Sequence, residues 1–114
     1  MPTSHLVKQY INWCQQGDWM ALSQNLYADS LKLYWNGEEV AQGPESACAF
    51  WQQKWNDLPG LSLSLLTTEV RSHQAQIVFD YCSRDAHGDP FDCTIKHKLT
   101  LSGSRIVMEH IEVV

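Results

Sequence analysis

Long apolar runs are missing from this sequence of 114 residues. No segment approaches the roughly 20 apolar residues that a membrane-spanning helix needs, and Met1–Tyr10 lacks the apolar stretch of a signal peptide. Basic residues are scarce as well, since eight Lys and Arg stand against thirteen Asp and Glu. The resulting net charge of −5 repels phosphate backbones and anionic lipids. We therefore expect a cytoplasmic protein whose partners include neither nucleic acid nor membrane.

The sequence also lacks the motifs that hold metals, phosphates or redox centres. The four cysteines, Cys14, Cys48, Cys82 and Cys93, include no Cys-x-x-Cys pair, and no two histidines have the close spacing of a metal site. There is no phosphate-binding loop, nucleophile elbow or dinucleotide fingerprint. We therefore expect no metal, no cofactor and cysteines that are buried free thiols.

What the sequence does contain is typical of one folded domain. Hydrophobic residues make up 44% of the chain and charged residues 18%, which argues against a disordered chain and a coiled coil. A chain of this length buries about two-thirds of its surface on folding, which is enough for one core. Because it has no linker, internal repeat or low-complexity segment, residues 1–114 are expected to form a single domain.

The first third of the chain has the periodicity of two helices. Apolar residues recur every three or four positions after Thr3 or Ser4, either of which can cap a helix. Gly17 is suited to end this helix, and Asp18 can cap the next one. The residues predicted to face the core are Leu6, Val7, Tyr10, Ile11 and Cys14 in the first helix, and Trp19, Leu22, Leu26 and Tyr27 in the second.

Turn and strand signals follow the two helices. Asn36-Gly37 predicts a tight hairpin after residues 31–35, because both central turn positions need a positive φ. Gly43-Pro44-Glu45 is typical of the start of a third helix. From Leu61 the apolar period changes to two, which predicts a half-exposed strand carrying Leu61, Leu63 and Leu65, and further strands near 75–84, 91–101 and 105–113. Helices on one face of such a meander make an α+β fold.

Several local motifs occur in the order and at the spacing of a known superfamily. They are Tyr10-Ile11, Gly17-Asp18, Tyr27-Ala28-Asp29, Gly43-x-Glu45 and Gly103-x-Arg105-Ile106. In these motifs the chain resembles the nuclear transport factor 2-like superfamily, and within it the SnoaL-like and ketosteroid-isomerase-like branch. The resemblance implies a cone-shaped, cystatin-like fold in which a curved antiparallel or mixed sheet wraps around the N-terminal helices. It also implies a central pocket for an apolar small-molecule ligand, and a homodimer.

The same resemblance allows three functional positions to be compared one at a time. Ketosteroid isomerases have a tyrosine just before the Gly-Asp corner, and Tyr10 occupies that place here. Their aspartate base corresponds to Trp35, which cannot abstract a proton, and their second hydrogen-bond donor corresponds to His97. Because two of the three roles are altered, steroid isomerisation is not the expected activity.

The last predicted hairpin gives an argument that does not depend on the resemblance. A three-residue turn over Ser102–Ser104 would place His97 directly opposite Glu109, within hydrogen-bonding reach. A carboxylate there would orient the imidazole and stabilise its charged form, as in acid–base sites. A purely structural His97–Glu109 pair is the alternative. A turn of two or four residues would instead invert the last strand and bring His110 or Glu112 inward.

The register of the preceding hairpin is also open in the sequence. A two-residue turn at His87-Gly88 would point Asp80 to the face of His97, whereas a three-residue turn would point it away. In the first case Cys82 and Cys93 would also be cross-strand neighbours, which more often reflects sheet packing than redox chemistry.

Five tryptophans are consistent with aromatic walls around a flat, apolar ligand. The residues predicted to line this pocket are Trp13, Trp35, Phe50, Trp51, Trp55, Phe79, Leu99 and Ile111. Our first hypothesis is a cofactor-free acid–base enzyme that catalyses isomerisation, aldol-type cyclisation, dehydration or epoxide hydration. In it, His97 is the acid–base group, Glu109 orients it, and Tyr10 donates to developing negative charge. The alternative is a non-catalytic ligand-binding or dimeric scaffold domain of the same fold.

Overall fold

The computed structural model describes residues 3–58, 60–84 and 87–114. Its elements, in chain order, are α1 (Thr3–Gln16), α2 (Trp19–Asn25), β1 (Tyr27–Trp35), β2 (Glu38–Gln42), α3 (Gly43–Asp57), β3 (Ser62–Val70), β4 (Gln74–Arg84), β5 (Pro90–Ser102) and β6 (Arg105–Val113). The strands form one sheet in the order β2-β1-β6-β5-β4-β3. Because β1 runs parallel to β6 and the other neighbours are antiparallel, the sheet is mixed, and the predicted α+β fold is confirmed.

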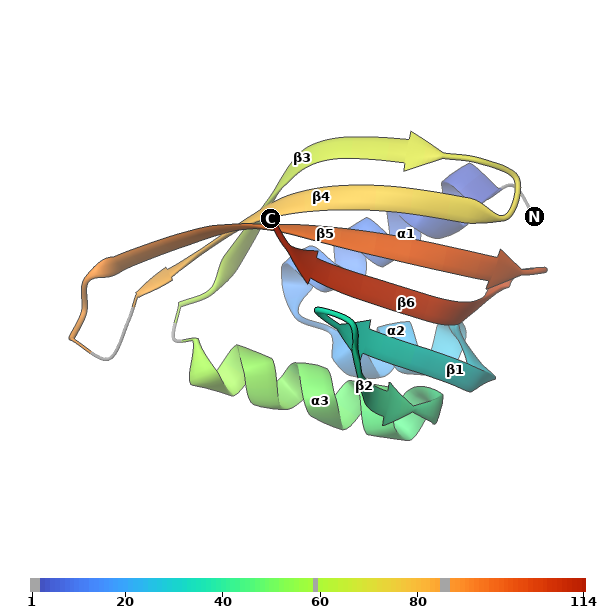
Figure 1. Cartoon of the computed structure of the whole chain (residues 1–114), viewed down its shortest axis with the longest axis horizontal. Coiled ribbons are helices and arrows are strands. Elements are labelled where there is room, and N and C mark those ends of the chain that lie inside the picture. The colour runs from blue at the N-terminus through green and yellow to red at the C-terminus, as the bar shows by residue number, and fades with distance from the viewer. Residues whose placement is uncertain (1–2, 59, 85–86) are drawn as a thin grey trace.

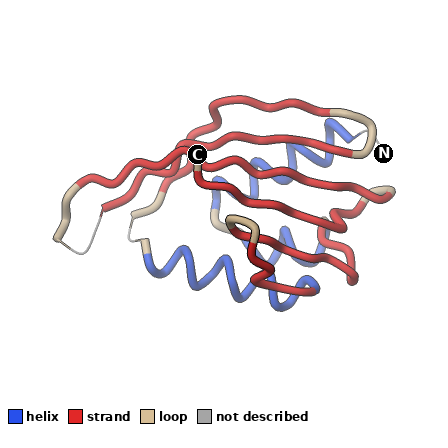
Figure 2. Tube along the Cα trace, in the orientation of Figure 1, coloured by secondary structure: helices blue, strands red, loops and turns tan. Residues whose placement is uncertain are grey.

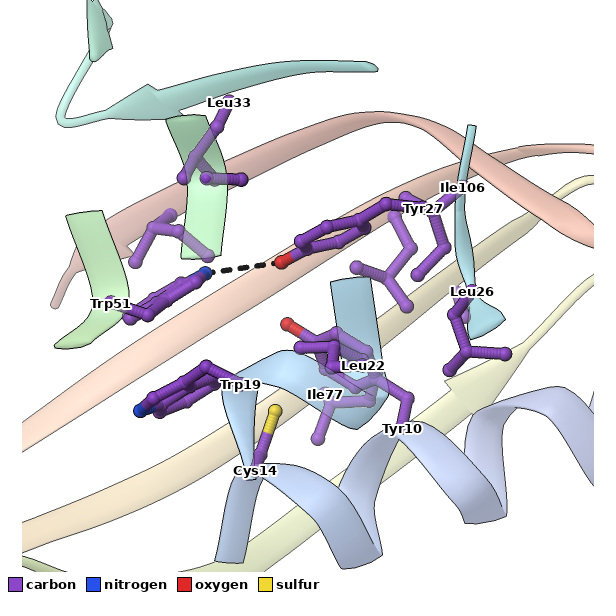
Figure 3. Close-up of a cluster of buried hydrophobic side chains, with 14 of the residues drawn as sticks. Tyr10, Cys14, Trp19, Leu22, Leu26, Tyr27, Leu33, Trp51, Ile77 and Ile106 are labelled. Atoms are coloured by element: carbon purple, nitrogen blue, oxygen red, sulfur yellow. Dashed lines mark hydrogen bonds between the residues drawn. The ribbon is translucent and has the colours of Figure 1, made fainter. Parts of the chain in front are cut away.

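The sheet curves, and the three helices cover one of its faces (Figure 1). The Cα trace shows the last residues of β4 and the first residues of β5 extending beyond α3 (Figure 2). Between the helices and the sheet lies a core to which nearly every element contributes a buried side chain, including Tyr10, Leu22, Trp51, Ile77 and Ile106 (Figure 3). Among the described residues, no helix is long and apolar enough to cross a membrane.

Local sequence explains where these elements begin and end. The Asp18 carboxylate accepts a hydrogen bond from the backbone N–H of Ala21 at 3.1 Å, which makes Asp18 the predicted cap of α2. Gly17, between α1 and α2, has a φ of 68°. Asn36 and Gly37 both have a positive φ, 49° and 85°, so the predicted tight turn joins β1 to β2.

The hairpin between β5 and β6 differs from the prediction in its turn. Ser102 pairs with Arg105, so the turn has two residues and not three. By itself, this change would invert β6 and turn Glu109 outward. The register then shifts beside Val107, where β6 has one residue more than β5, and this bulge turns β6 back to the predicted face.

The bulge also changes which residues lie directly opposite each other. His97 pairs with Ile111, and Glu109 pairs with Leu99. The predicted direct opposition of His97 and Glu109 is therefore wrong by two residues. Both side chains nevertheless share the inner face as diagonal neighbours, and each is 0% exposed.

The remaining register alternatives are also resolved by the structure. Tyr81 pairs with Cys93, so the odd residues of β4 face inward with His97, and Asp80 lies on the outer face. Cys82 lies opposite Asp92 and not beside Cys93, and both cysteines are free.

The last strand is not inverted, and its residues His110 and Glu112 lie on the outer face of the sheet. There the ring of His110 stacks on Tyr34 at 4.5 Å between centroids, and the carboxylate of Glu112 pairs with Lys98 at 3.4 Å. Neither His110 nor Glu112 therefore reaches the inner face where His97 lies.

Two element predictions need correction. Tyr27 begins β1, because α2 ends at Asn25. In β3, Leu63 is buried but Leu65 is 44% exposed, although both pair in regular register with inward-facing residues of β4, Tyr81 and Phe79.

The corner between α1 and α2 gives a first testable prediction. A Cβ at Gly17 would lie 2.8 Å from the indole of Trp55, whereas a Cβ at Gly60, whose φ is 67°, meets nothing within 4 Å. In both alanine variants the substituted residue must adopt a positive φ, which lowers the unfolding free energy by about 1 kcal/mol. Gly17→Ala also displaces a packed indole, which adds about 1–3 kcal/mol.

Urea denaturation of the two variants measures this difference. We expect Gly17→Ala to lose about 2–4 kcal/mol of unfolding free energy and Gly60→Ala to lose about 1 kcal/mol. Equal losses would mean that the contact with Trp55 does not constrain the corner.

Candidate functional site

One fully buried polar group of the core is the imidazole of His97, which bonds to two tyrosines. The Tyr10 hydroxyl of α1 lies 2.6 Å from Nδ1, and the Tyr81 hydroxyl of β4 lies 2.6 Å from Nε2. The indole of Trp51 stacks on the imidazole at 5.7 Å between centroids, and Phe79 meets it edge-on at 5.1 Å. Both ring nitrogens are therefore satisfied in an otherwise aromatic environment.

A second buried polar group, the carboxyl of Glu109, lies beside the first. The Tyr27 hydroxyl is 3.2 Å from each carboxyl oxygen. The indole N–H of Trp51 donates to that hydroxyl at 3.0 Å, which Figure 3 marks with a dashed line. The hydroxyl of Tyr10, which bonds to His97, also lowers the pKa of this carboxyl.

Burial sets the charge of these groups. Desolvation lowers the pKa of His97 from 6.5 to about 3, because the charged imidazolium loses its hydration. Desolvation likewise raises the pKa of Glu109 from 4.5 to about 8, although hydrogen bonds from Tyr10 and Tyr27 act in the opposite direction. Burial also raises the pKa of Tyr10, Tyr27 and Tyr81 well above the usual value. At neutral pH the group is therefore a network of uncharged donors and acceptors.

An uncharged imidazole has one N–H donor and one acceptor nitrogen. Consequently one of the two tyrosines bound to His97 donates its hydroxyl hydrogen, and the other accepts a hydrogen bond. Either Tyr10 donates to Nδ1 while Nε2 donates to Tyr81, or Tyr81 donates to Nε2 while Nδ1 donates to Tyr10. The 2.6 Å distances are compatible with both directions.

A cavity of about 220 Å³ lies beside this network, near the C-terminal end of α3. It is lined by Trp35, Trp51, Lys54, Trp55, Asp57, Leu58, Leu61, Tyr81, Phe91, Cys93, Ile95 and Val113. Trp51 and Tyr81 belong both to this lining and to the immediate contacts of His97. His97 is therefore one side chain away from the cavity.

The structure brings some of the predicted site residues together and separates others. Tyr10, His97 and Glu109 meet in the interior, where each is 0% exposed. Three predicted pocket residues, Trp35, Trp51 and Trp55, line the cavity. The other five do not line it: Phe79, Leu99 and Ile111 are buried in the core, and Trp13 and Phe50 pack half-buried against it.

Two residues of the network, Tyr27 and Tyr81, were not identified as site residues from the sequence. Tyr27 was expected only as a core residue of α2, and Tyr81 only as a neighbour of Asp80. The signal that identifies Tyr81 is the alternation of Ile77, Phe79 and Tyr81 along β4, read with the inward position of His97.

Potential metal ligands gather elsewhere among the described residues. Asp80, Cys82 and Asp92 have ligand atoms within 4.8 Å of one another on the outer face of the sheet. The Cys82 thiol donates to Asp80 at 3.4 Å, and Asp92 is exposed. This group is separated from His97 by the sheet and contributes nothing to the network.

A curved mixed sheet that encloses helices and a buried polar network, beside an aromatic cavity, defines a cone-shaped α+β domain of the nuclear transport factor 2-like class. The family model of the SnoaL-like domain matches residues 4–110. The chain therefore belongs to the SnoaL-like domain family, as its motifs implied. A search of the curated proteins finds no match.

Solved structures support the same fold. A protein from Jannaschia sp. CCS1, described as a SnoaL-like polyketide cyclase, superposes with a TM-score of 0.86 at 13% identity, over 99% of this chain and 88% of that one. An NTF2-like protein of unknown function from Cytophaga hutchinsonii gives 0.84 at 14% identity, over 99% and 100%. A protein of Catenulispora acidiphila with a ketosteroid isomerase-like fold, solved in complex with trimethylamine, gives 0.81 at 14%, over 96% and 85%.

The buried pair predicts how stability depends on pH. Folding raises the pKa of Glu109 from 4.5 to about 8, so its contribution to stability is lost as pH rises through this range. Folding lowers the pKa of His97 from 6.5 to about 3, so its contribution is lost as pH falls through that range. Between pH 4.5 and 6.5 the two effects on the unfolding free energy cancel. Between pH 6.5 and 8 only the effect of Glu109 remains, so the unfolding free energy falls as pH rises.

Urea denaturation at pH 6.5 and at pH 8 tests this dependence. We expect the wild type to lose roughly 2 kcal/mol of unfolding free energy over this interval, at about 1.4 kcal/mol per pH unit. Glu109→Gln should remove most of this loss, whereas Glu112→Gln, a half-exposed position on the same strand, should retain it. An equal loss in all three proteins would contradict the raised pKa of Glu109.

Proposed function

We propose that this protein is a SnoaL-like enzyme that performs cofactor-free acid–base chemistry on a small apolar carbonyl compound. In this proposal the compound binds in the cavity lined by Trp35, Trp55 and Tyr81. The single observation that carries the proposal is that Tyr81 borders the cavity and bonds to the buried His97 at 2.6 Å.

The chemistry follows from what surrounds the ligand. Apart from Lys54, Asp57 and Cys93, the cavity wall is aromatic and aliphatic, so a hydrogen bond to a ligand oxygen beside Tyr81 is little weakened by water. A tyrosine hydroxyl can donate to a carbonyl oxygen as negative charge develops on it during enolisation, while the α-proton passes to the carboxylate of Asp57 in the cavity lining or to solvent. Tyr81 is accordingly the proposed acid, and His97, which does not border the cavity, acts through it.

The size of the cavity limits the ligand. Typical small-molecule sites measure about 300–1,000 Å³, and this cavity measures about 220 Å³. The proposed substrates are therefore single-ring or short-chain compounds, and larger polycyclic compounds are excluded unless the cavity opens. Lys54, whose Nζ lies 4.6 Å from the ring centroid of Trp35, supplies a positive charge at the edge of the site.

A second candidate function is favoured by the burial of the network. His97 is 0% exposed and both of its ring nitrogens are bonded, which is also what a purely structural core histidine requires. In that case the protein binds its ligand without catalysis. The two functions differ in whether the bound ligand exchanges protons faster than it does in buffer.

Deuterium exchange at the α-carbons of cyclohexanone, followed by NMR in D₂O, provides a direct test. We expect the wild type to accelerate exchange, and Tyr81→Phe to reduce this acceleration by about 10²–10⁴-fold, the usual value of a positioned acid or base. Tyr34→Phe is the matched control, because this half-buried ring stacks on His110 on the outer face. It should leave exchange unchanged.

Binding must be measured in the same samples, using the fluorescence of the cavity tryptophans. Tyr81→Phe should still bind cyclohexanone, because the aromatic rings that line the cavity are all retained. Binding by the wild type without accelerated exchange would support the non-catalytic function.

A further inference from the structure

Lys54 brings a positive charge to a cavity lining that is otherwise mostly aromatic and aliphatic. Its Nζ lies 4.6 Å from the ring centroid of Trp35 and 5.5 Å from that of Phe50. The faces of aromatic rings attract a cation, and two such contacts restrain this flexible side chain. Because Trp35 itself lines the cavity, the ammonium is held against the cavity wall.

This ammonium has no negative partner in the part of the chain that the structure describes. Neither of the ion pairs there includes Lys54, and its Nζ donates no hydrogen bond to a described residue. Asp57 also lines the cavity, but it is exposed and its carboxylate accepts a hydrogen bond from the amide of Gln53 at 2.9 Å. The half-buried Lys54 therefore has its N–H donors available for a ligand.

We propose that Lys54 binds a carboxylate of the ligand, and that the substrates of this site are small oxo-carboxylic acids. This inference rests on the proposed function, in which Tyr81 donates to the carbonyl oxygen of a compound in the same cavity. It adds a second, charged point of recognition at the other end of that compound.

Burial determines which end of such a ligand lies inward. Tyr81 is 3% exposed, whereas Lys54 is half-buried. An ionised carboxylate loses too much hydration to lie deep in an apolar cavity, so it stays at the edge, where Lys54 and water both bind it. The ring or chain of the ligand then lies against Trp35 and Trp55, and its carbonyl points to Tyr81. The carbonyl and the carboxylate therefore belong at opposite ends of the substrate.

The charges of the cavity wall favour a carboxylate over a neutral group of the same shape. A hydrogen bond between an ammonium and a carboxylate is roughly twice as strong as one between neutral groups. Asp57 repels an anion, but its exposure to solvent weakens this repulsion. The net charge of −5 also opposes an anion, although physiological salt screens exposed charges beyond about 8 Å. The contact with Lys54 therefore decides the preference.

Isothermal titration calorimetry at pH 7 with two matched probes tests this contact without any reaction. Cyclohexanecarboxylate and cyclohexanecarboxamide have nearly the same shape and differ in charge. We expect the wild type to bind the carboxylate about tenfold more tightly, a value between those of an exposed and a buried charged hydrogen bond. Lys54→Met, which keeps an unbranched apolar side chain over Trp35 and Phe50, should lower this ratio to one or less.

Two further variants control the measurement. Lys54→Arg keeps the positive charge and should keep the preference for the carboxylate. Lys96→Met removes a half-buried lysine of β5 that does not line the cavity, so it changes the net charge equally and should leave the ratio at the wild-type value. Because the ratio compares two probes in one protein, a loosened cavity affects both alike. An unchanged ratio in Lys54→Met, or a wild type that does not prefer the carboxylate, would overturn the proposal.

A second experiment follows deuterium exchange at the α-carbons of 4-oxocyclohexanecarboxylate and 4-oxocyclohexanecarboxamide. A contact that is equally strong in the ground state and the transition state changes KM and not kcat. We therefore expect Lys54→Met to raise the KM of the carboxylate about tenfold, to leave its kcat nearly unchanged, and to leave the KM of the carboxamide unchanged.

The two experiments separate this inference from the proposed function. A carboxylate preference that depends on Lys54, without accelerated exchange of either ketone, supports the carboxylate contact and refutes catalysis. Accelerated exchange with equal KM values for the carboxylate and the carboxamide supports catalysis and refutes the carboxylate contact. If none of the four probes binds, the cavity is not a ligand site and the inference is wrong.

Discussion

The arrangement of the interior depends on two hydrogen bonds that hold the His97 imidazole, one with the hydroxyl of Tyr10 and one with that of Tyr81, at 2.6 Å each. These two bonds join α1 to β5, which is remote from it in sequence, and β5 to β4, its neighbour in the chain. They also make a fully buried imidazole tolerable, since an unsatisfied polar group in such a core costs about 1–3 kcal/mol. Removal of either hydroxyl would leave a ring nitrogen without its partner, and removal of the Tyr10 hydroxyl would also break a bond between α1 and the sheet.

Much of the fold was predictable because its signals are local. The cap at Asp18, the Asn36-Gly37 turn and the period-two pattern from residue 75 onward each depend on a few neighbouring residues, and the structure has all three. The bulge beside Val107 is different. It lets Glu109 face inward although the turn has only two residues. Whether such a bulge forms depends on packing across the whole sheet and not on neighbouring residues.

The sequence predicted three residues of the candidate site, Tyr10, His97 and Glu109, but not the hydrogen bonds that Tyr27 and Tyr81 make to them. The alternation of apolar residues along β5 predicted that His97 faces inward, whereas the direction of Glu109 depended on the turn and the bulge. Tyr81 was missed because strand register fixes it, and the register of β4 with β5 decides whether Asp80 or Tyr81 faces inward. A sequence read one strand at a time therefore finds the buried histidine but not the tyrosine that connects it to the cavity.

A network of uncharged groups is costly to maintain in a core, since apolar residues of similar volume are often equally stable or more so. Its effect here is on the charge of the interior. Because desolvation lowers the pKa of His97 to about 3 and raises that of Glu109 to about 8, both groups are uncharged near neutral pH, and the core holds no ion pair between them. Burial thus sets the protonation of the imidazole and the carboxyl, and the tyrosine hydroxyls that bond to them satisfy their polar atoms.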